Sequence, residues 1–308
     1  QSDGSGRLVA DAADPQSAGN GELFIDLEAF GLVCIDDEDT DDLSGDAAEA
    51  RAGGDAVLRA IATSLAQRGC HLALADINAA GLAETVSLLP GSGLRVTQHA
   101  LDVADRAAVV AFPAIVLAQH GGADVLVNNA GVALGGTFDM VSEEDFDWLF
   151  NINFHGVVRM TRAFLPLLRA SAEARLVNIS SIFGIVAPAE QVAYAASKFA
   201  VRGFSEALRH ELDGSTVGVT VVHPGGVRTN ISESARAPQG VDNADVARRR
   251  AAFKKFLRMP PSKAGEIIVR GIEQRKKRVL VGSDAVGLSL LARLAPVSYW
   301  SVMVKGLP

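Results

Sequence analysis

The sequence predicts an α/β protein built on a doubly wound, mostly parallel β-sheet with helices on both faces. Two observations indicate this class. Between residues 58 and 282, short and almost wholly apolar segments alternate with longer segments whose apolar residues recur at helical spacing. Strands that are apolar along their whole length are typical of parallel sheets buried on both faces. The composition agrees, because 48% of the 308 residues are hydrophobic and 30 are glycine, as in compact α/β proteins.

The elements follow from this alternation. The expected strands are residues 71–76, 94–102, 124–131, 175–180, 217–224 and 278–282. The expected helices are residues 58–69, 77–89, 104–120, 142–169, 194–212, 232–258 and 262–274. Gly69 ends the first helix, and Ser142 with the acidic residues after it begins the fourth. The fourth helix is long enough to be either one helix or two with a break.

The two ends of the chain differ from this middle part. Residues 1–50 hold 14 of the 36 acidic residues and one of the 29 basic residues. Residues 1–22 are expected to be a disordered acidic tail, and residues 23–308 a single domain. The apolar C-terminal extension, residues 284–308, approaches the length of a membrane span, but Arg293 and Pro296 interrupt it. We expect an amphipathic or oligomer-facing end, with peripheral membrane contact left open.

Composition also excludes several classes of function. Cys34 and Cys70 form neither a disulfide framework nor a CxxC motif, and residues 1–16 lack the apolar core of a signal peptide. A cytoplasmic protein is therefore expected. The basic residues are not interleaved with aromatic ones, so nucleic acid is not an expected partner. No metal site is expected.

The segment from Asn178 to Lys198 carries the strongest functional signal. Tyr194 and Lys198 are four residues apart, so on a helix they share one face. Ser181 lies thirteen residues before Tyr194, at the end of an expected strand. A hydroxyl, a phenol and an ammonium at one point suit proton transfer to or from an alcohol oxygen, because the ammonium favours the phenolate. The alternative is an unremarkable Tyr and Lys on a surface helix.

Other motifs occur in order along the chain. They are Asn128-Asn129-Ala130-Gly131 after a strand, Asn153-x-x-Gly156, Ser181, Tyr194-x-x-x-Lys198, and Pro224-Gly225 leading to Val227 and Thr229. On these motifs the sequence resembles the short-chain dehydrogenases/reductases (SDR family), most clearly over residues 58–230.

The resemblance implies a Rossmann-like sheet of about seven strands and an oxidoreductase that interconverts a secondary alcohol and a ketone with NAD or NADP. It implies that Tyr194 is the acid/base and that Lys198 supports Tyr194 and holds the nicotinamide ribose. Ser181 would bind the substrate oxygen, with Ser180 as its competitor. Asn153 would hold a water of the proton relay through a local helix distortion.

The cofactor residues follow from the same resemblance. Asp76, at the end of the second strand, would accept the adenosine ribose hydroxyls and repel a 2′-phosphate, so NAD is favoured over NADP. The remaining expected contacts are Asp102 and Val103 beside the adenine, Asn129, Ala130 and Gly131 along the ribose, Tyr194 and Lys198, and Val227 and Thr229 at the carboxamide and phosphate.

The N-terminal part departs from the family pattern. The glycine-rich loop TGxxxGxG aligns with residues 51–58, which read RAGGDAVL, so Ala52, Ala56 and Leu58 replace the expected glycines. Ala56 and Leu58 would obstruct the pyrophosphate and the packing of helix on strand. We expect residues 32–35 to supply the first strand, with the acidic residues 36–50 as an insertion.

Three explanations of this degenerate loop stay open. Cofactor binding is weakened or lost, or it uses an unfamiliar loop, or the residues up to about 57 are not the natural reading of the gene. The alternative function is accordingly a catalytically impaired SDR-fold protein that binds a partner or a lipid.

Substrate and assembly are inferred more coarsely. A lid over residues 231–259 and the apolar C-terminus would close on an apolar alcohol or ketone. Relatives pair through helices that correspond to residues 146–168 and 199–212, so a homodimer or homotetramer is expected.

Overall fold

The structure is a computed structural model that describes residues 30–34, 56–90, 93–231, 235–236 and 242–305. The strands are β1 (Phe30–Cys34), β2 (His71–Asp76), β3 (Val96–Ala100), β4 (Val125–Asn128), β5 (Ala174–Ile179), β6 (Val217–Pro224) and β7 (Arg278–Val281). They form a seven-stranded sheet of order β3-β2-β1-β4-β5-β6-β7, and every neighbouring pair is parallel. The expected fold class is confirmed.

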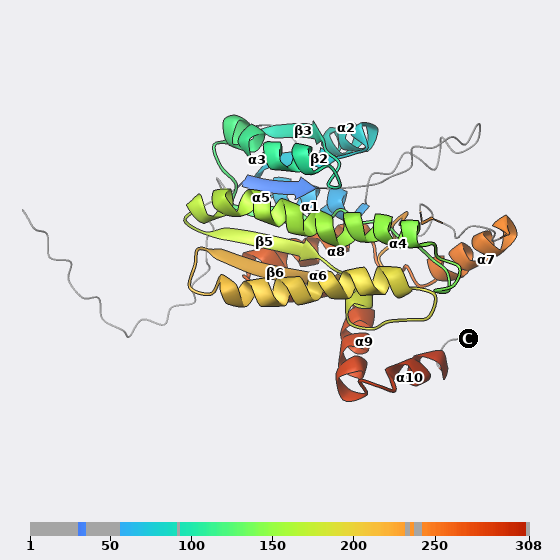
Figure 1. Ribbon diagram of the computed structural model, residues 1–308. Helices are drawn as coiled ribbons and strands as arrows, with labels where there is room; N and C mark the ends of the chain where they lie inside the picture. Colours follow the sequence, from blue (N-terminus) through green and yellow to red (C-terminus); the bar gives the residue numbers. More distant parts are fainter. Residues whose placement is uncertain (1–29, 35–55, 91–92, 232–234, 237–241, 306–308) are drawn as a thin grey trace, which may run out of the picture.

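Helices connect these strands on both faces of the sheet (Figure 1). They are α1 (Ala56–Ala66), α2 (Ala79–Ser87), α3 (Arg106–His120), α4 (Glu143–Phe150), the π-helix η1 (Asn151–Gly156), α5 (Val157–Ala170), the 3₁₀-helix η2 (Ile182–Gly184), α6 (Val192–Glu211), α7 (Asn243–Lys254), α8 (Pro261–Glu273), α9 (Ser283–Leu294) and α10 (Tyr299–Lys305).

The first strand lies in the middle of the sheet. β1 pairs with β2 on one side and with β4 on the other, with Gly31 opposite both Leu72 and Val125. The strand expected at residues 32–35 is therefore present. Because the chain reverses its direction of winding between β1 and β4, the carboxyl ends of these two strands border the crevice in which doubly wound folds bind ligands.

Successive residues of a strand face opposite sides of the sheet, and this divides the core into two clusters. Leu72 and Leu74 of β2 pack with α1, α2 and α8, whereas Ala73 and Ala75 pack with α3, α5 and α6. Each buried strand residue is thus covered by a helix, which explains why these strands are apolar along their length.

The bounds of three helical segments were left open by the sequence. The segment 142–169, expected as one helix or as two with a break, is divided by η1, which shifts the backbone hydrogen bonds between α4 and α5. Within the segment 232–258, the described helix is α7, Asn243–Lys254. The extension 284–308 forms α9 and α10, because Pro296 in the connecting turn lacks the backbone N–H that a continuous helix requires.

Several expectations lie outside the described residues: the tail 1–22, the acidic insertion 36–50 and residues 51–55 of the degenerate glycine loop. Residues 56–58 of that loop are described, and they correct the expectation that Leu58 obstructs packing. Leu58 does not obstruct the packing of helix on strand, because its fully buried side chain belongs to the core cluster beneath α1.

The C-terminal helices pack on the segment that follows Ser181. Ala285 of α9 is buried with Ile182 and Val186, and Tyr299 packs against the same cluster. The Ala187 N–H donates to the Tyr299 hydroxyl oxygen at 2.9 Å. Figure 1 shows α9 and α10 extending from the body of the molecule. No helix among the described residues is long and apolar enough to cross a membrane.

Candidate active site

The expected site residues gather at the carboxyl ends of the parallel strands. Asp76 ends β2, Asn128 ends β4, and Ser181 follows Ile179 at the end of β5. This is the edge at which doubly wound sheets bind their ligands. The described residues contain no group of three or more His, Cys, Asp or Glu side chains that could hold a metal ion.

Tyr194 and Lys198 lie in the first turns of α6, one turn apart. The Lys198 ammonium is 5.7 Å from the centroid of the Tyr194 ring, and only 3% of Lys198 is exposed. Its Nζ donates to the carbonyl oxygen of Ile179 at 3.2 Å. A cation held this close to a half-buried phenol stabilises the phenolate electrostatically.

Asn153 is held by both ends of its amide. Its Oδ1 accepts from the Val132 N–H at 2.8 Å, and its Nδ2 donates to the Val132 carbonyl at 3.0 Å and to Ser197 Oγ at 3.1 Å. Ser197 in turn donates to the Tyr194 carbonyl at 2.8 Å. The side chain therefore joins the segment after β4 to α6. The expected helix distortion is present, since Asn153 lies within η1, a π-helical turn of the kind frequent at functional sites.

Ser180 and Ser181 have different surroundings. Ser180 is buried, and its hydroxyl donates to the Lys198 carbonyl at 2.8 Å. Ser181 is partly exposed, and its Oγ accepts from the Phe183 N–H at 3.1 Å, which leaves the hydroxyl proton able to donate elsewhere. Ser181 is consequently the more accessible of the two serines, while Ser180 fixes α6 to β5.

His223 supports Ser181 from the neighbouring strand, a role that the motifs did not indicate. It is fully buried in β6, and its Nδ1 lies 2.9 Å from the Ser181 carbonyl oxygen. A carbonyl only accepts, so Nδ1 carries the proton in the neutral ring. Burial lowers the pKa of His223 to about 4, and the neutral form holds the end of β5 in place.

His223 is expected to make stability depend on pH. Its folded pKa of about 4 lies below the ordinary value of about 6.5, so the unfolded chain binds more protons between these values. Stability is then fully present above pH 6.5 and is lost as pH falls, by about 2 kcal/mol from pH 7 to pH 5. Urea unfolding at a series of pH values measures this slope.

The matched variant is His223→Asn, whose amide can still donate to the Ser181 carbonyl but does not titrate. We expect its free energy of unfolding to change less between pH 7 and pH 5 than that of the wild type. An identical slope in both proteins would show that another group is responsible.

The residues expected to bind the cofactor include Asp76, at the carboxyl end of β2, and Asn129, Ala130 and Gly131, directly after β4. Asp76 is buried, and its Oδ1 accepts from the Asn78 N–H at 2.8 Å. A Cβ at Gly131 would lie 3.1 Å from Lys198 Nζ and 3.3 Å from Asn153 Oδ1, so glycine leaves a space between these groups. Asn129 and Ala130 are buried beside it.

The remaining residues expected to bind the cofactor differ in how exposed their side chains are. Asp102 is partly exposed and accepts from the Ala104 N–H. Val103 and Val227 have their side chains in the core. Only their main chains are therefore left for the expected contacts with a cofactor. Thr229 is partly exposed in the segment after β6.

Three supporting residues were not indicated by the sequence motifs: Ser197, His223 and Asp284. The first two stand next to motif residues, at Lys198 and Pro224. A polar residue in an otherwise apolar strand, as in VTVVHP, is the signal that could have indicated His223. Asp284 Oδ2 accepts from the Gly226 N–H at 2.6 Å, a contact between segments 58 residues apart that no local pattern reveals.

Known proteins resemble this chain in sequence and in structure. The family model described as short chain dehydrogenase matches residues 52–240. SadH of Mycobacterium tuberculosis is 40% identical over 258 residues, which are 82% of this chain and 92% of SadH. Oxidoreductase UcpA of Escherichia coli K12 is 36% identical over 210 residues, 67% of this chain and 80% of UcpA.

A solved structure agrees. A short-chain dehydrogenase/reductase from Burkholderia phymatum, in complex with NAD, superimposes with a TM-score of 0.73 at 26% identity, covering 87% of this chain and 94% of that one. Because the family model spans more than half of the chain, and a relative 40% identical covers most of it, this protein belongs to the short-chain dehydrogenase family.

Proposed function

We propose that this protein catalyses the NAD-dependent interconversion of a secondary alcohol and a ketone, with Tyr194 as the acid/base. One observation carries the proposal: Lys198 and Asn153 converge on Gly131, with the Tyr194 ring 5.7 Å from the Lys198 ammonium. Membership of the short-chain dehydrogenase family supports an oxidoreductase that acts on CH–OH groups with a nicotinamide cofactor.

The chain's own groups handle the proton. In ketone reduction, the Tyr194 hydroxyl would donate its proton to the substrate oxygen, while the Ser181 hydroxyl donates a hydrogen bond to the same oxygen. In alcohol oxidation, the Tyr194 phenolate would accept that proton. The nearby Lys198 ammonium stabilises the phenolate in both directions. The bound nicotinamide supplies or accepts the hydride.

Asn153 has a different part. Its side-chain amide is already bonded to Val132 and Ser197, so it positions the Gly131 segment against α6. We assign the water-holding role to the main chain of the π-helical turn.

The described residues fit a nicotinamide dinucleotide. The buried Asp76 carboxylate stands at the end of β2, beside the central strand β1, where a ribose would lie in a doubly wound fold. Gly131 leaves the space that a Cβ would fill. Asp76 would accept the adenosine ribose hydroxyls, and Lys198 would hold those of the nicotinamide ribose.

Asp76 is expected to determine the choice of cofactor. Asp76→Asn keeps the oxygen that accepts from Asn78 but removes the charge that opposes a 2′-phosphate. We expect the ratio of kcat/KM for NADP to that for NAD to rise about tenfold, since hydrogen bonds to charged groups contribute about 1.5–3 kcal/mol. Steady-state kinetics with both cofactors measures the ratio, and circular dichroism checks the fold. An unchanged ratio would place the ribose elsewhere.

Two measurements test the proposal. Oxidation of NADH is followed with a panel of aliphatic, steroidal and retinoid carbonyl compounds, and NAD is titrated into the protein by calorimetry. Turnover of at least one ketone and micromolar NAD binding are expected. No binding at millimolar NAD would favour the impaired protein that binds a partner or a lipid.

The surface of the C-terminal helices bears on assembly. Apolar side chains are exposed on and between the C-terminal helices, with Leu294 75% and Val297 93% exposed. We propose that this surface is covered in a homodimer or homotetramer, with peripheral membrane contact as the competing use. We further propose a cytoplasmic enzyme, which fits a buried Cys70 whose thiol pKa burial raises to about 11.

A further inference from the structure

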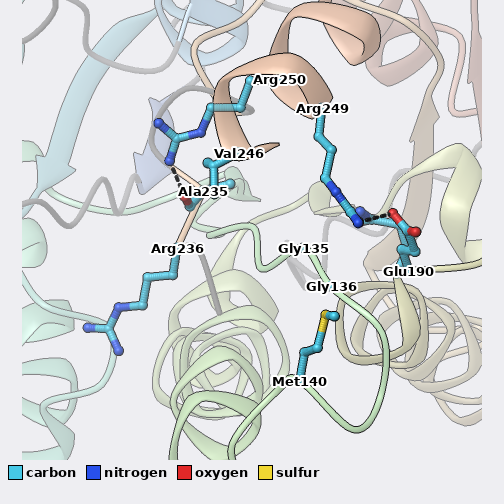
Figure 2. A pocket seen from close by; sticks show the side chains of 10 residues that line it. Gly135, Gly136, Met140, Glu190, Ala235, Arg236, Val246, Arg249 and Arg250 are labelled. Atoms are coloured by element: carbon cyan, nitrogen blue, oxygen red, sulfur yellow. Dashed lines mark hydrogen bonds and ion pairs between the residues drawn. The ribbon is translucent and has the colours of Figure 1, made fainter. Parts of the chain in front are cut away.

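A small cavity lies between α7 and the segments that precede α4 and α6. Its volume is about 110 Å³, and its lining includes Gly136, Met140 and Val246 together with charged side chains. Figure 2 shows these side chains around the space between α7 and the segments before α4 and α6. Sites for whole ligands occupy about 300–1,000 Å³, so this cavity suits the end group of a larger molecule.

The cavity is connected to the proton-transfer residues along the chain. The segment that begins at Gly131, beside Lys198 and Asn153, continues to Gly136 on the cavity wall. Gly136 donates its N–H to the Glu190 carbonyl at 3.1 Å. Gln191, which also lines the cavity, stands immediately before α6 and three residues before Tyr194. Along the chain, the cavity lining thus comes within three residues of Tyr194 and within four of Gly131.

Three arginines line the cavity, and their partners differ. Arg236 turns away from the other two in Figure 2, stacks 3.7 Å from the Trp148 ring and pairs with Asp145. Arg249 pairs with Glu190 at 2.6 Å. Arg250 is partly buried and donates to the carbonyl oxygen of Ala235 at 2.6 Å, and no carboxylate among the described residues pairs with it. Arg250 is thus a cationic group at the cavity with a neutral partner, able to accept an anion.

Glu190 shows that this rim is under strain. Its φ is +65°, a left-handed conformation that non-glycine residues seldom adopt. Such conformations cost about 1–3 kcal/mol and occur often at ligand clamps. Glu190 contacts both the Gly136 segment, through its carbonyl oxygen, and Arg249 of α7, through its side chain. One guanidinium group of the cavity is therefore already paired with a carboxylate.

We propose that the cavity binds an anionic end group, a carboxylate at the far end of an apolar ketone or secondary alcohol, with Arg250 as its main contact. The inference rests on the proposed function and names the substrate class for the same site. Arg249 contributes when the substrate carboxylate competes with Glu190. Guanidinium groups suit this task because their fork geometry matches a carboxylate.

The test compares two series of substrates in the full-length protein. One series consists of (ω−1)-oxoalkanoates of increasing chain length, and the other of their neutral primary amides, which have the same shape. At the best chain length we expect the acid to exceed the amide about tenfold in kcat/KM, through KM. Arg250→Gln should raise KM for the acid about tenfold and leave the amide within about twofold, as expected for loss of a charged hydrogen bond at a partly exposed site.

Two further variants sharpen the comparison. Glu190→Gln removes the competing carboxylate and should lower KM for the acid about twofold to threefold. Arg270→Gln, on α8 and paired with Glu266 at 2.6 Å, removes a guanidinium far from the cavity and should change neither series. Equal use of acid and amide by the wild type, or an equal effect of Arg250→Gln on both, would overturn the assignment.

Calorimetry separates this inference from the proposed reaction. Acid and amide are titrated into the protein with and without NADH. Acid binding that Arg250→Gln weakens, with no turnover of either series, would support the cavity and count against the reaction. Turnover of both series without any preference for the acid would support the reaction and overturn the cavity.

Discussion

Replacing Tyr194 with Phe is expected to lower kcat about 10³-fold, because the substrate oxygen loses its proton donor in one direction and its acceptor in the other. Positioned acid/base groups contribute about 10²–10⁴-fold to rate. The ring remains, so packing of Tyr194 against Phe183, with centroids 6.2 Å apart, is preserved and KM should change little. Initial rates of NADH oxidation with the best ketone measure the effect.

The chain offers a matched control in its second tyrosine. Tyr299→Phe removes the hydroxyl that accepts from the Ala187 N–H, which should cost about 1 kcal/mol of stability and keep kcat within a few-fold. If Tyr194→Phe retained the wild-type kcat, Tyr194 would not be the acid/base. If the two variants lost activity equally, the loss would reflect general disturbance of the fold.

Gly184→Ala is expected to lower stability and activity together. A Cβ at this position would lie 2.7 Å from the Lys198 carbonyl oxygen and closer still to Ser180 Oγ. The first of these atoms is backbone, so η2 or α6 must shift. Overpacking of this kind costs about 1–3 kcal/mol, and we expect the upper end of that range. Displacement of the α6 turn that carries Lys198 should also lower kcat about tenfold or more.

Gly203→Ala is the control for that change. Gly203 lies inside α6, and a Cβ there would meet nothing within 4 Å. Alanine is favoured over glycine in helix interiors by about 1 kcal/mol, so this variant should raise the melting temperature and keep full activity. Thermal unfolding followed by circular dichroism measures both variants. A stable, fully active Gly184→Ala protein would show that the close contact does not constrain the site.

Local patterns were enough to predict the sheet and the placement of Tyr194 and Lys198 on one helix. The buried strands are apolar throughout, and the Tyr194–Lys198 spacing corresponds to one helical turn. Even β1 was placed within two residues, although acidic residues follow it. The division of residues 142–169 was less determined, because a π-helical turn uses the same residue types as an α-helix and is stabilised here by tertiary bonds such as those of Asn153 with Val132.

The parts that sequence did not reveal depend on contacts between distant segments. Leu58 looked like an obstruction when compared with a glycine, but the core beneath α1 receives it. His223 and Asp284 act on Ser181 and Gly226 across different elements. The pairing of Arg249 with Glu190 arises only when α7 lies beside the segment before α6. The spacing of residues along the chain does not predict these contacts between distant segments.

The packing of α9 and α10 on residues 182–187 has a consequence for biosynthesis. Tyr299 contacts Ala187 across 112 residues of sequence, and Ala285 completes the cluster around Ile182 and Val186. All strands of the sheet are synthesised before α9 and α10. Until these two helices have left the ribosome, the apolar side chains of the segment after Ser181 stay uncovered. Contacts of such long range form late in folding. The nascent protein is therefore expected to fold its sheet first and to acquire activity only after α9 and α10 have emerged from the ribosome.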